Sequence, residues 1–177
     1  MKTNRRIFLV GMMGAGKTTV GRQLAKRLGK TFYDADREIE ARTGVSVAVI
    51  FDIEGETGFR KREAEVLEQL TELDDIVLAT GGGAVLDARN REHLKNRGFV
   101  IYLHALPPVL WQRTRADKSR PLLQGGSPRE RLDALYALRD PLYRDAADLV
   151  IETGRQGIGP LLSQVLTRFD EACRLSA

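Results

Sequence analysis

The chain has 177 residues, 42% hydrophobic and 29% charged, a composition typical of one compact domain. No apolar run approaches the roughly 18 residues that span a membrane, and the apolar run after the basic start is too short for a signal peptide. The net charge of +4 comes from 28 Lys and Arg and 24 Asp and Glu scattered along the chain, so we expect no nucleic-acid partner. The single cysteine cannot form an internal disulfide, which predicts a cytoplasmic protein.

A phosphate-binding loop is the strongest motif. A predicted buried strand over residues 6–10 and a predicted helix over 17–28 flank the segment GMMGAGKT, which matches G-x-x-x-x-G-K-[ST]. In this pattern, backbone N–H groups surround a polyphosphate and the helix adds its positive N-terminal end. Lys17 is expected to reach the β- and γ-phosphates, and Thr18 to ligate Mg²⁺. The motif predicts binding of a nucleoside triphosphate through Gly14, Ala15, Gly16, Lys17, Thr18 and Thr19.

Two aspartates, Asp34 and Asp36, follow the second predicted strand, residues 31–34. One carboxylate can help to hold Mg²⁺ through its water shell, and the other can orient and deprotonate an acceptor hydroxyl. An aspartate directly before Arg37 also suits a helix N-cap, which would explain one of the two carboxylates. The position of the pair beside the phosphate-binding loop favours a functional role. Helices are predicted next, over 36–55 and 56–73.

Three glycines, Gly81, Gly82 and Gly83, follow the third predicted strand, residues 76–80. A tight turn needs one or two glycines at most, so three indicate a close approach of the backbone to a ligand. The alternative is a plain flexible loop. No aspartate ends this strand, which makes Asp34 the better candidate for supporting a metal ion.

The rest of the chain continues the alternation of strands and helices. This alternation predicts a three-layer α/β/α domain with five parallel strands, whose ligands bind beyond the carboxyl ends of the strands. Arg120 lies in a polar segment that could act as a lid over bound phosphate. Taken singly, Arg60, Arg120 and Arg139 are more typical of a solvated surface. The remaining predicted strands cover 99–103 and 147–151, and the remaining helices 88–96, 107–115, 128–145 and 158–175.

Six motifs, taken together, resemble the shikimate kinase family in their order and spacing, from residue 6 to about residue 155. The resemblance implies a single P-loop kinase domain over residues 1–177, with strand order 2-3-1-4-5 and a lid at about 114–126. It also implies transfer of the γ-phosphoryl group of MgATP to the 3-hydroxyl of shikimate, a step toward chorismate and the aromatic amino acids. The motifs are the phosphate-binding loop, Asp34-x-Asp36, Phe59-Arg60-x-x-Glu63, Gly81-Gly82-Gly83, Arg120-Pro121-Leu122-Leu123 and Arg139-x-Pro141-Leu142-Tyr143.

The resemblance assigns shikimate to Asp36, Arg60, Arg139 and the glycine triplet around Gly82. The planar guanidinium groups of the two arginines fit a carboxylate. Asp36 would hold ring hydroxyls and act as the base or orienting group, although which carboxylate is the true base stays open.

On the nucleotide side, the resemblance places Lys17 and Arg120 against the transferring phosphoryl group. Thr18 would ligate Mg²⁺ directly, and Asp34 would lie in the next layer of groups around the ion. The residues that would flank adenine are Arg113 and Arg155.

Two other functions stay possible from the sequence. A kinase for another small acid, such as gluconate, would share the loop and the lid. A nucleotide switch or nucleic-acid-binding ATPase would bind the nucleotide without a small acceptor, but a switch should carry an Asn-Lys-x-Asp motif, which is absent. We expect a monomer, which suits a lid enzyme of this size.

Overall fold

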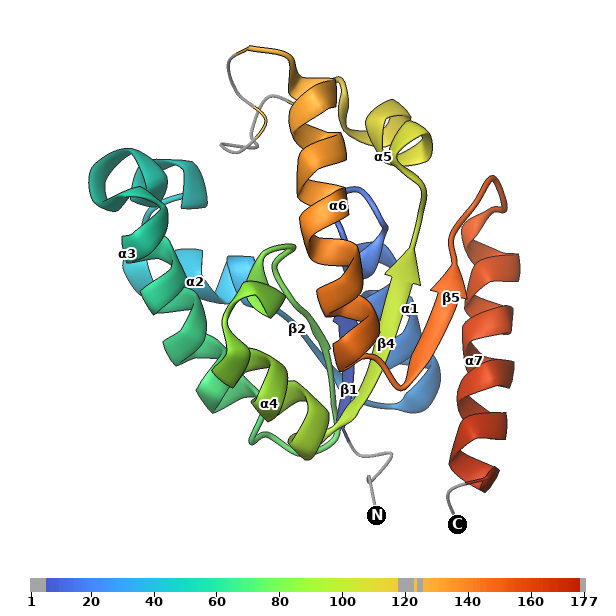
Figure 1. Ribbon diagram of the computed structural model, residues 1–177. Helices are drawn as coiled ribbons and strands as arrows, with labels where there is room; N and C mark the ends of the chain where they lie inside the picture. Colours follow the sequence, from blue (N-terminus) through green and yellow to red (C-terminus); the bar gives the residue numbers. More distant parts are fainter. Residues whose placement is uncertain (1–5, 118–122, 124–125, 176–177) are drawn as a thin grey trace.

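A five-stranded parallel sheet organises the chain, whose computed structural model describes residues 6–117, 123 and 126–175 (Figure 1). The strand order β2-β3-β1-β4-β5 confirms the predicted order. The strands are β1 (Arg6–Val10), β2 (Thr31–Asp34), β3 (Ile76–Ala79), β4 (Phe99–His104) and β5 (Leu149–Glu152). The helices are α1 (Lys17–Leu28), α2 (Ala35–Thr43), α3 (Val47–Leu70), α4 (Ala88–Arg97), α5 (Pro107–Thr114), α6 (Pro128–Ala146) and α7 (Ile158–Leu175), with a short 3-10 turn η1 (Ala84–Leu86).

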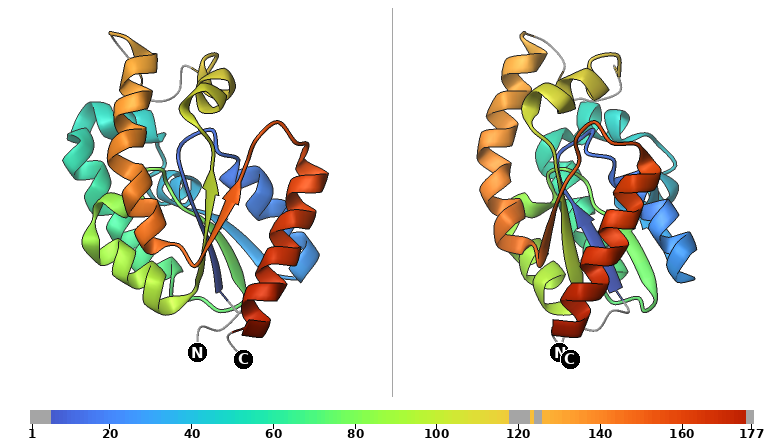
Figure 2. Two further views of the ribbon diagram at one scale, coloured as in Figure 1. Left: turned by 45° about the vertical axis from the view of Figure 1, so that its right-hand side comes forward. Right: turned by 90° about the vertical axis from the view of Figure 1, so that its right-hand side faces the viewer.

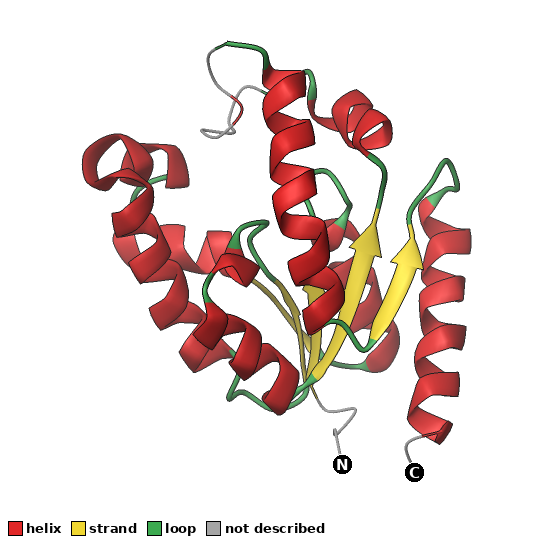
Figure 3. Cartoon of the chain, viewed as in Figure 1, coloured by secondary structure: helices red, strands yellow, loops and turns green. Residues whose placement is uncertain are grey.

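Helices cover both faces of the sheet, as the three-layer prediction requires. Figure 2 shows α4 and α6 on one face and α1 and α7 on the other. The helix α3 packs beside α4 and extends past the sheet with α2. The loops that follow β1, β3 and β4 gather at one end of the sheet (Figure 3), where ligands of such sheets bind.

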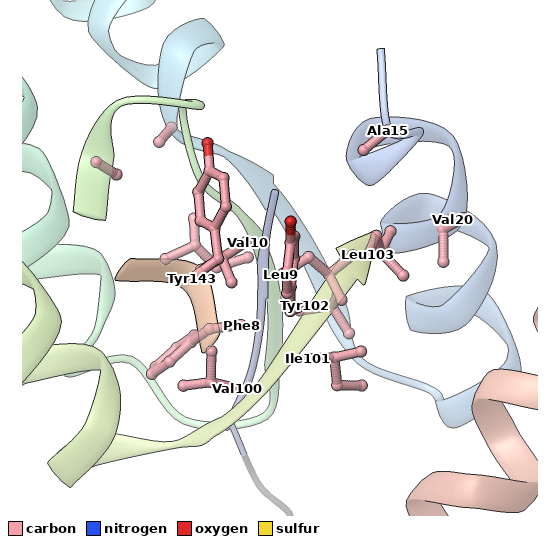
Figure 4. Packing of buried hydrophobic residues seen from close by; sticks show 14 of the residues in the cluster. Phe8, Leu9, Val10, Ala15, Val20, Val100, Ile101, Tyr102, Leu103 and Tyr143 are labelled. Carbon is pink, nitrogen blue, oxygen red and sulfur yellow. The ribbon is translucent and has the colours of Figure 1, made fainter. Parts of the chain in front are cut away.

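The core lies along the central strands, which are apolar on both faces because helices cover both. Phe8 and Leu9 of β1 are fully buried, and Phe8 pairs in register with Leu78 of β3 and Val100 of β4 (Figure 4). This packing fixes the ends of the strands from which the loops depart. None of the helices within the described ranges is both long and apolar enough to cross a membrane.

The predicted division between residues 55 and 56 is confirmed, because Gly55 has a non-helical backbone, with φ 68° and ψ −176°, that separates two helical segments within α3. The prediction missed an earlier break, where Gly44 ends α2 in a left-handed conformation with φ 73°. The Ser46 hydroxyl accepts a hydrogen bond from the first turn of α3, which starts the next helix. The other predicted elements begin and end within two residues of the observed ones.

Candidate active site

The phosphate-binding loop joins β1 to α1 in backbone conformations that glycine allows. Gly14 has φ 81° and Gly16, at the start of α1, has φ 98°. Because Gly16 offers no side chain to cap the helix, the N–H groups of its first turn stay available to an anion. A cavity of about 300 Å³ opens over them, which we call the phosphate cavity. It is lined by Met13, Gly14, Gly16, Lys17, Thr18, Thr19, Asp34, Asp36, Thr80, Gly81 and Gly82.

Lys17 lies folded over its own loop. Its ammonium donates to the carbonyl oxygens of Gly11 at 2.6 Å and Met12 at 2.9 Å. The side chain also lines the phosphate cavity, so the charge is held within reach of a bound polyphosphate. An ammonium rotates and shifts its donors easily, which suits a group that follows a moving phosphoryl.

Asp34 connects the loop to α2. Its Oδ2 accepts the Thr18 hydroxyl at 2.6 Å, and its Oδ1 accepts the backbone N–H groups of Asp36 at 3.1 Å and Arg37 at 3.2 Å. The helix N-cap is therefore Asp34, and not the aspartate directly before Arg37. Because the Thr18 hydroxyl donates its proton to Asp34, the lone pairs of the Thr18 oxygen remain available to a cation. Such hard oxygen donors fit Mg²⁺.

Asp36 lies in the first turn of α2 and lines the phosphate cavity. Its Oδ1 is buried without a hydrogen-bond partner in the part of the chain that the structure describes. Burial, followed by the charges of Glu63 and Asp34, raises the pKa of Asp36 to about 6. A carboxyl with this pKa can accept a proton close to neutral pH.

A second cavity, of about 240 Å³, adjoins the first; we call it the acceptor cavity. Both cavities include Met13, Asp36, Gly81 and Gly82 in their walls, so they meet at Asp36 and the glycine turn. A phosphoryl donor in one cavity would thus face an acceptor in the other. The acceptor cavity is lined in addition by Glu40, Val47, Phe51, Phe59, Arg60, Glu63, Gly83, Asp117 and Arg139.

The glycine triplet lies directly against charged side chains of the acceptor cavity. A Cβ on Gly81 would come within 2.5 Å of Glu63 Oε2 and 3.0 Å of Asp36 Oδ1. A Cβ on Gly83 would overlap the Arg60 guanidinium. The turn is also fixed by hydrogen bonds, since the Tyr143 hydroxyl donates to the Gly82 carbonyl. Close packing against functional groups, more than loop flexibility, explains the three glycines.

Replacing Gly81 by alanine is expected to lower kcat/KM about 100-fold, because the new methyl group displaces Asp36 and Glu63 together. The matched control is Gly159→Ala on α7, where a Cβ meets no atom within 4 Å. Steady-state kinetics of both variants check this expectation. Equal activity of the two variants would show that the geometry around Gly81 does not matter for turnover.

Two arginines bring positive charge to the acceptor cavity. Arg139 is only 1% exposed, and its three guanidinium nitrogens have no hydrogen-bond partner among the described residues. A buried, unpaired guanidinium is costly, which indicates that a ligand completes it. Arg60 is partly buried and donates to Glu63 at 2.8 Å. Its neighbour Arg62, in contrast, has a side chain that is 42% exposed, pairs with Glu54 and lies outside the acceptor cavity.

Glu63 is a buried residue of the acceptor cavity to which the sequence assigned no role. Its Oε1 accepts from Arg60, its Oε2 has no partner among the described residues, and burial raises its pKa. Its position on α3 shares the core-facing side with Phe59 and Val66, both buried. A glutamate at helical spacing within an apolar stripe is the signal that could have identified it.

The residues expected around adenine lie at the far side of the phosphate-binding loop. Arg113 donates to the Gly14 carbonyl at 3.1 Å and to the Gly154 carbonyl at 2.7 Å, so it ties the loop to the segment after β5. Arg155 follows in that segment and is exposed. Arg120 and most of the predicted lid lie outside the described residues.

The raised pKa of Asp36 predicts an acidic limb in the pH profile. With the nucleotide saturating, kcat/KM for the acceptor should fall tenfold per pH unit below an apparent pKa of about 6, since protonated Asp36 cannot accept the proton of an acceptor hydroxyl. A profile that stays flat from pH 5 to 8 in protein that remains folded would show that turnover does not depend on the protonation of Asp36.

Known proteins are similar to this chain over most of its length. The family model described as shikimate kinase matches residues 13–170. The shikimate kinase of Burkholderia lata is 60% identical over 166 residues, which cover 94% of this chain and 90% of that protein. A solved structure of shikimate kinase from Acinetobacter baumannii in complex with shikimate has a TM-score of 0.93 at 50% identity, covering 96% of this chain and 95% of that one.

A gluconokinase from Sinorhizobium meliloti 1021 is similar as well, with a TM-score of 0.57 at 15% identity over 100% of this chain and 99% of that one. At this identity the likeness shows the shared P-loop kinase fold alone. The family model and the close relatives decide the assignment, and they agree with the resemblance seen in the motifs. The chain belongs to the shikimate kinase family.

Proposed function

We propose that this chain transfers the γ-phosphoryl group of MgATP to the 3-hydroxyl of shikimate, giving shikimate 3-phosphate and ADP. Family membership makes it an ATP-dependent small-molecule kinase. The observation that carries the proposal is the meeting of the two cavities at Asp36, with the unpaired guanidinium of Arg139 in the acceptor cavity. A kinase for a carboxylate-bearing alcohol needs both features.

On the acceptor side, Arg139 and Arg60 bind the carboxylate of shikimate through charge-assisted hydrogen bonds. The backbone of Gly81, Gly82 and Gly83 approaches the ring closely, since no side chain intervenes there. The proposal is supported by the Acinetobacter baumannii relative, whose structure contains shikimate. Asp36 accepts a hydrogen bond from the 3-hydroxyl and turns its oxygen toward the phosphate cavity.

On the donor side, the N–H groups from Gly14 to Thr19 hold the β-phosphate, and Lys17 leaves the loop carbonyls to contact the β- and γ-phosphates. Thr18 ligates Mg²⁺ and Asp34 holds Thr18 in place, as their hydrogen bond supports. The ion, when bound, offsets negative charge on the phosphates. Arg113 and Arg155 flank the adenine.

The transfer itself needs positioning and charge stabilisation more than a strong base, because the transition state is loose. Asp36 orients the hydroxyl throughout and takes its proton late. Arg120, carried by a lid at about 114–126, approaches the transferring phosphoryl group. We further propose that one domain spanning residues 1–177 does all of this, as a cytoplasmic monomer without a nucleic-acid or membrane partner.

Phosphorus and proton NMR of the reaction product tests the proposal. We expect a single phosphate monoester, with its phosphorus coupled to the proton on carbon 3 of the shikimate ring. A phosphate on another ring hydroxyl would show that Asp36 does not select the 3-hydroxyl. Product formation from gluconate would favour the alternative kinase instead.

A further inference from the structure

The motif Arg139-x-Pro141-Leu142-Tyr143 contains a second polar side chain, that of Tyr143, to which the proposed reaction assigns no role. Tyr143 is fully buried on α6, and its hydroxyl donates to the carbonyl oxygen of Gly82 in the glycine turn. Burial raises the pKa of Tyr143, so the hydroxyl stays protonated and remains a donor. The hydrogen bond therefore links α6 to the turn at all pH values of interest.

Arg139 and Tyr143 lie four residues apart on one helix, so they project from the same face. Both reach Gly82, because the Arg139 NH1 atom lies 3.4 Å from the position of a Cβ on Gly82. Two side chains of one helical face thus lie beside a single glycine, and the Tyr143 hydroxyl is hydrogen-bonded to it.

Pro141 lies between these two residues, inside α6. Proline has no N–H, so the helix lacks one backbone hydrogen bond at this turn, and the ring pushes against the carbonyl of Ala137. The backbone hydrogen bonds of α6 therefore constrain the conformation around Arg139 less than they would in a helix without proline. Contacts such as that between Tyr143 and Gly82 must supply the missing constraint.

The ring of Tyr143 and its hydroxyl make different contacts. It packs against Tyr102 of β4 with ring centroids 4.9 Å apart, and Figure 4 shows the two side chains side by side in the core. Tyr102 directs its own hydroxyl to Asp140, at 2.8 Å, and not to the glycine turn. The two tyrosines therefore share a packing site but differ in what their hydroxyl groups bind.

The hydrogen bond also fixes a peptide plane. The described peptide bonds are all trans, so the N–H of Gly83 points opposite to the Gly82 carbonyl, away from Tyr143. Gly82, Gly83 and Arg139 all line the acceptor cavity. Rotation of this peptide would change the donors that the turn presents there.

We propose that Tyr143 is a positioning residue for the substrate carboxylate: its hydroxyl sets the orientation of the Gly82–Gly83 peptide and its spacing from Arg139. This inference rests on the proposed function, in which Arg139 and the glycine turn hold the shikimate carboxylate. Tyr143 does not line the acceptor cavity, and it acts through the turn and through its direct interaction with the Arg139 side chain. Its effect should accordingly appear in shikimate binding and leave ATP binding unchanged.

The test is Tyr143→Phe, which keeps the ring and removes the hydroxyl. We expect KM for shikimate to rise about tenfold, because the Gly82 carbonyl loses its buried donor. The kcat value should stay within about threefold and KM for ATP should not change. The matched control is Tyr102→Phe, which removes a hydroxyl from the same ring pair and should leave KM for shikimate within about twofold.

A calorimetric measurement separates positioning from simple destabilisation. Starting from the ligand-free, folded protein, we measure the dissociation constants of shikimate and of its uncharged carboxamide. Tyr143→Phe should weaken shikimate binding about tenfold and carboxamide binding by less than about twofold. Equal weakening of both ligands, or the same loss in Tyr102→Phe, would overturn the inference. Wild-type protein that does not bind or phosphorylate shikimate would instead overturn the proposed function.

Discussion

Asp36→Asn is expected to lower kcat about 1,000-fold while the affinity for ATP stays unchanged. The amide has the size of the carboxylate but lacks the charge that orients the substrate hydroxyl and cannot accept its proton, and a positioned proton acceptor typically contributes 10²–10⁴-fold. The nucleotide contacts remain, because Asp34 still holds Thr18 and caps α2. A coupled assay of ADP release gives kcat, and calorimetry with MgATP gives the affinity.

The same substitution should stabilise the protein at alkaline pH. The pKa of Asp36 is about 6 in the folded protein and 3.8 as its ordinary value. Ionisation therefore destabilises the folded state as the pH rises from about 4 through 6, and the penalty is complete above 6. Asp36→Asn should raise the free energy of unfolding by roughly 2–3 kcal/mol at pH 8, with little change at pH 4.

The exposed Asp133 on α6 provides the control, since Asp133→Asn should change neither kcat nor stability noticeably. Denaturant unfolding at the two pH values measures the stability difference. A kcat value within tenfold of the unsubstituted protein would remove the proton-accepting role from Asp36. A stability gain without a loss of kcat would show that burial, and not catalysis, explains its raised pKa.

Arg139→Ala is expected to raise KM for shikimate between about 100- and 1,000-fold, because the carboxylate loses its buried charged partner. The guanidinium is almost fully buried, and its three nitrogens have no partner among the described residues, so a bound carboxylate gains its full donor set. The phosphate cavity does not include this residue, so KM for ATP should stay unchanged.

Arg144 gives a matched control on the same helix. Its side chain is 47% exposed and pairs with Asp140, outside both cavities. Arg144→Ala should leave both KM values within about twofold, as is typical of exposed ion pairs. If Arg139→Ala also kept the KM for shikimate of the unsubstituted protein, the carboxylate would have to bind elsewhere in the acceptor cavity.

The sequence predicted the elements around the phosphate-binding loop most accurately. Both β1 and α1 have the predicted ends, because the motif fixes the strand, the loop and the helix together. The break at Gly55 was predicted, but the earlier break at Gly44 was missed, because a lone glycine in a polar segment does not by composition alone show that a helix ends there. In the structure both glycines interrupt a helix with positive φ, 73° at Gly44 and 68° at Gly55.

The acceptor cavity was harder to predict than the phosphate cavity. Composition makes Arg60 and Arg62 equally typical of a solvated helix surface and does not tell which of them lies beside a cavity. Glu63 pairs with Arg60 within α3, but the burial of Glu63 and the hydrogen bond from Tyr143 to Gly82 depend on how α3 and α6 pack against the glycine turn. The packing arises from contacts distant in sequence, which local patterns do not encode.

The most direct test of the account is ADP release from MgATP in a coupled assay, without acceptor, with shikimate and with gluconate as the matched acid. We predict rapid release with shikimate and only background release in the other two reactions, since the two cavities meet where a carboxylate-anchored ring would present its hydroxyl. Release with gluconate in place of shikimate, or release independent of any acceptor, would contradict the assignment of the acceptor cavity.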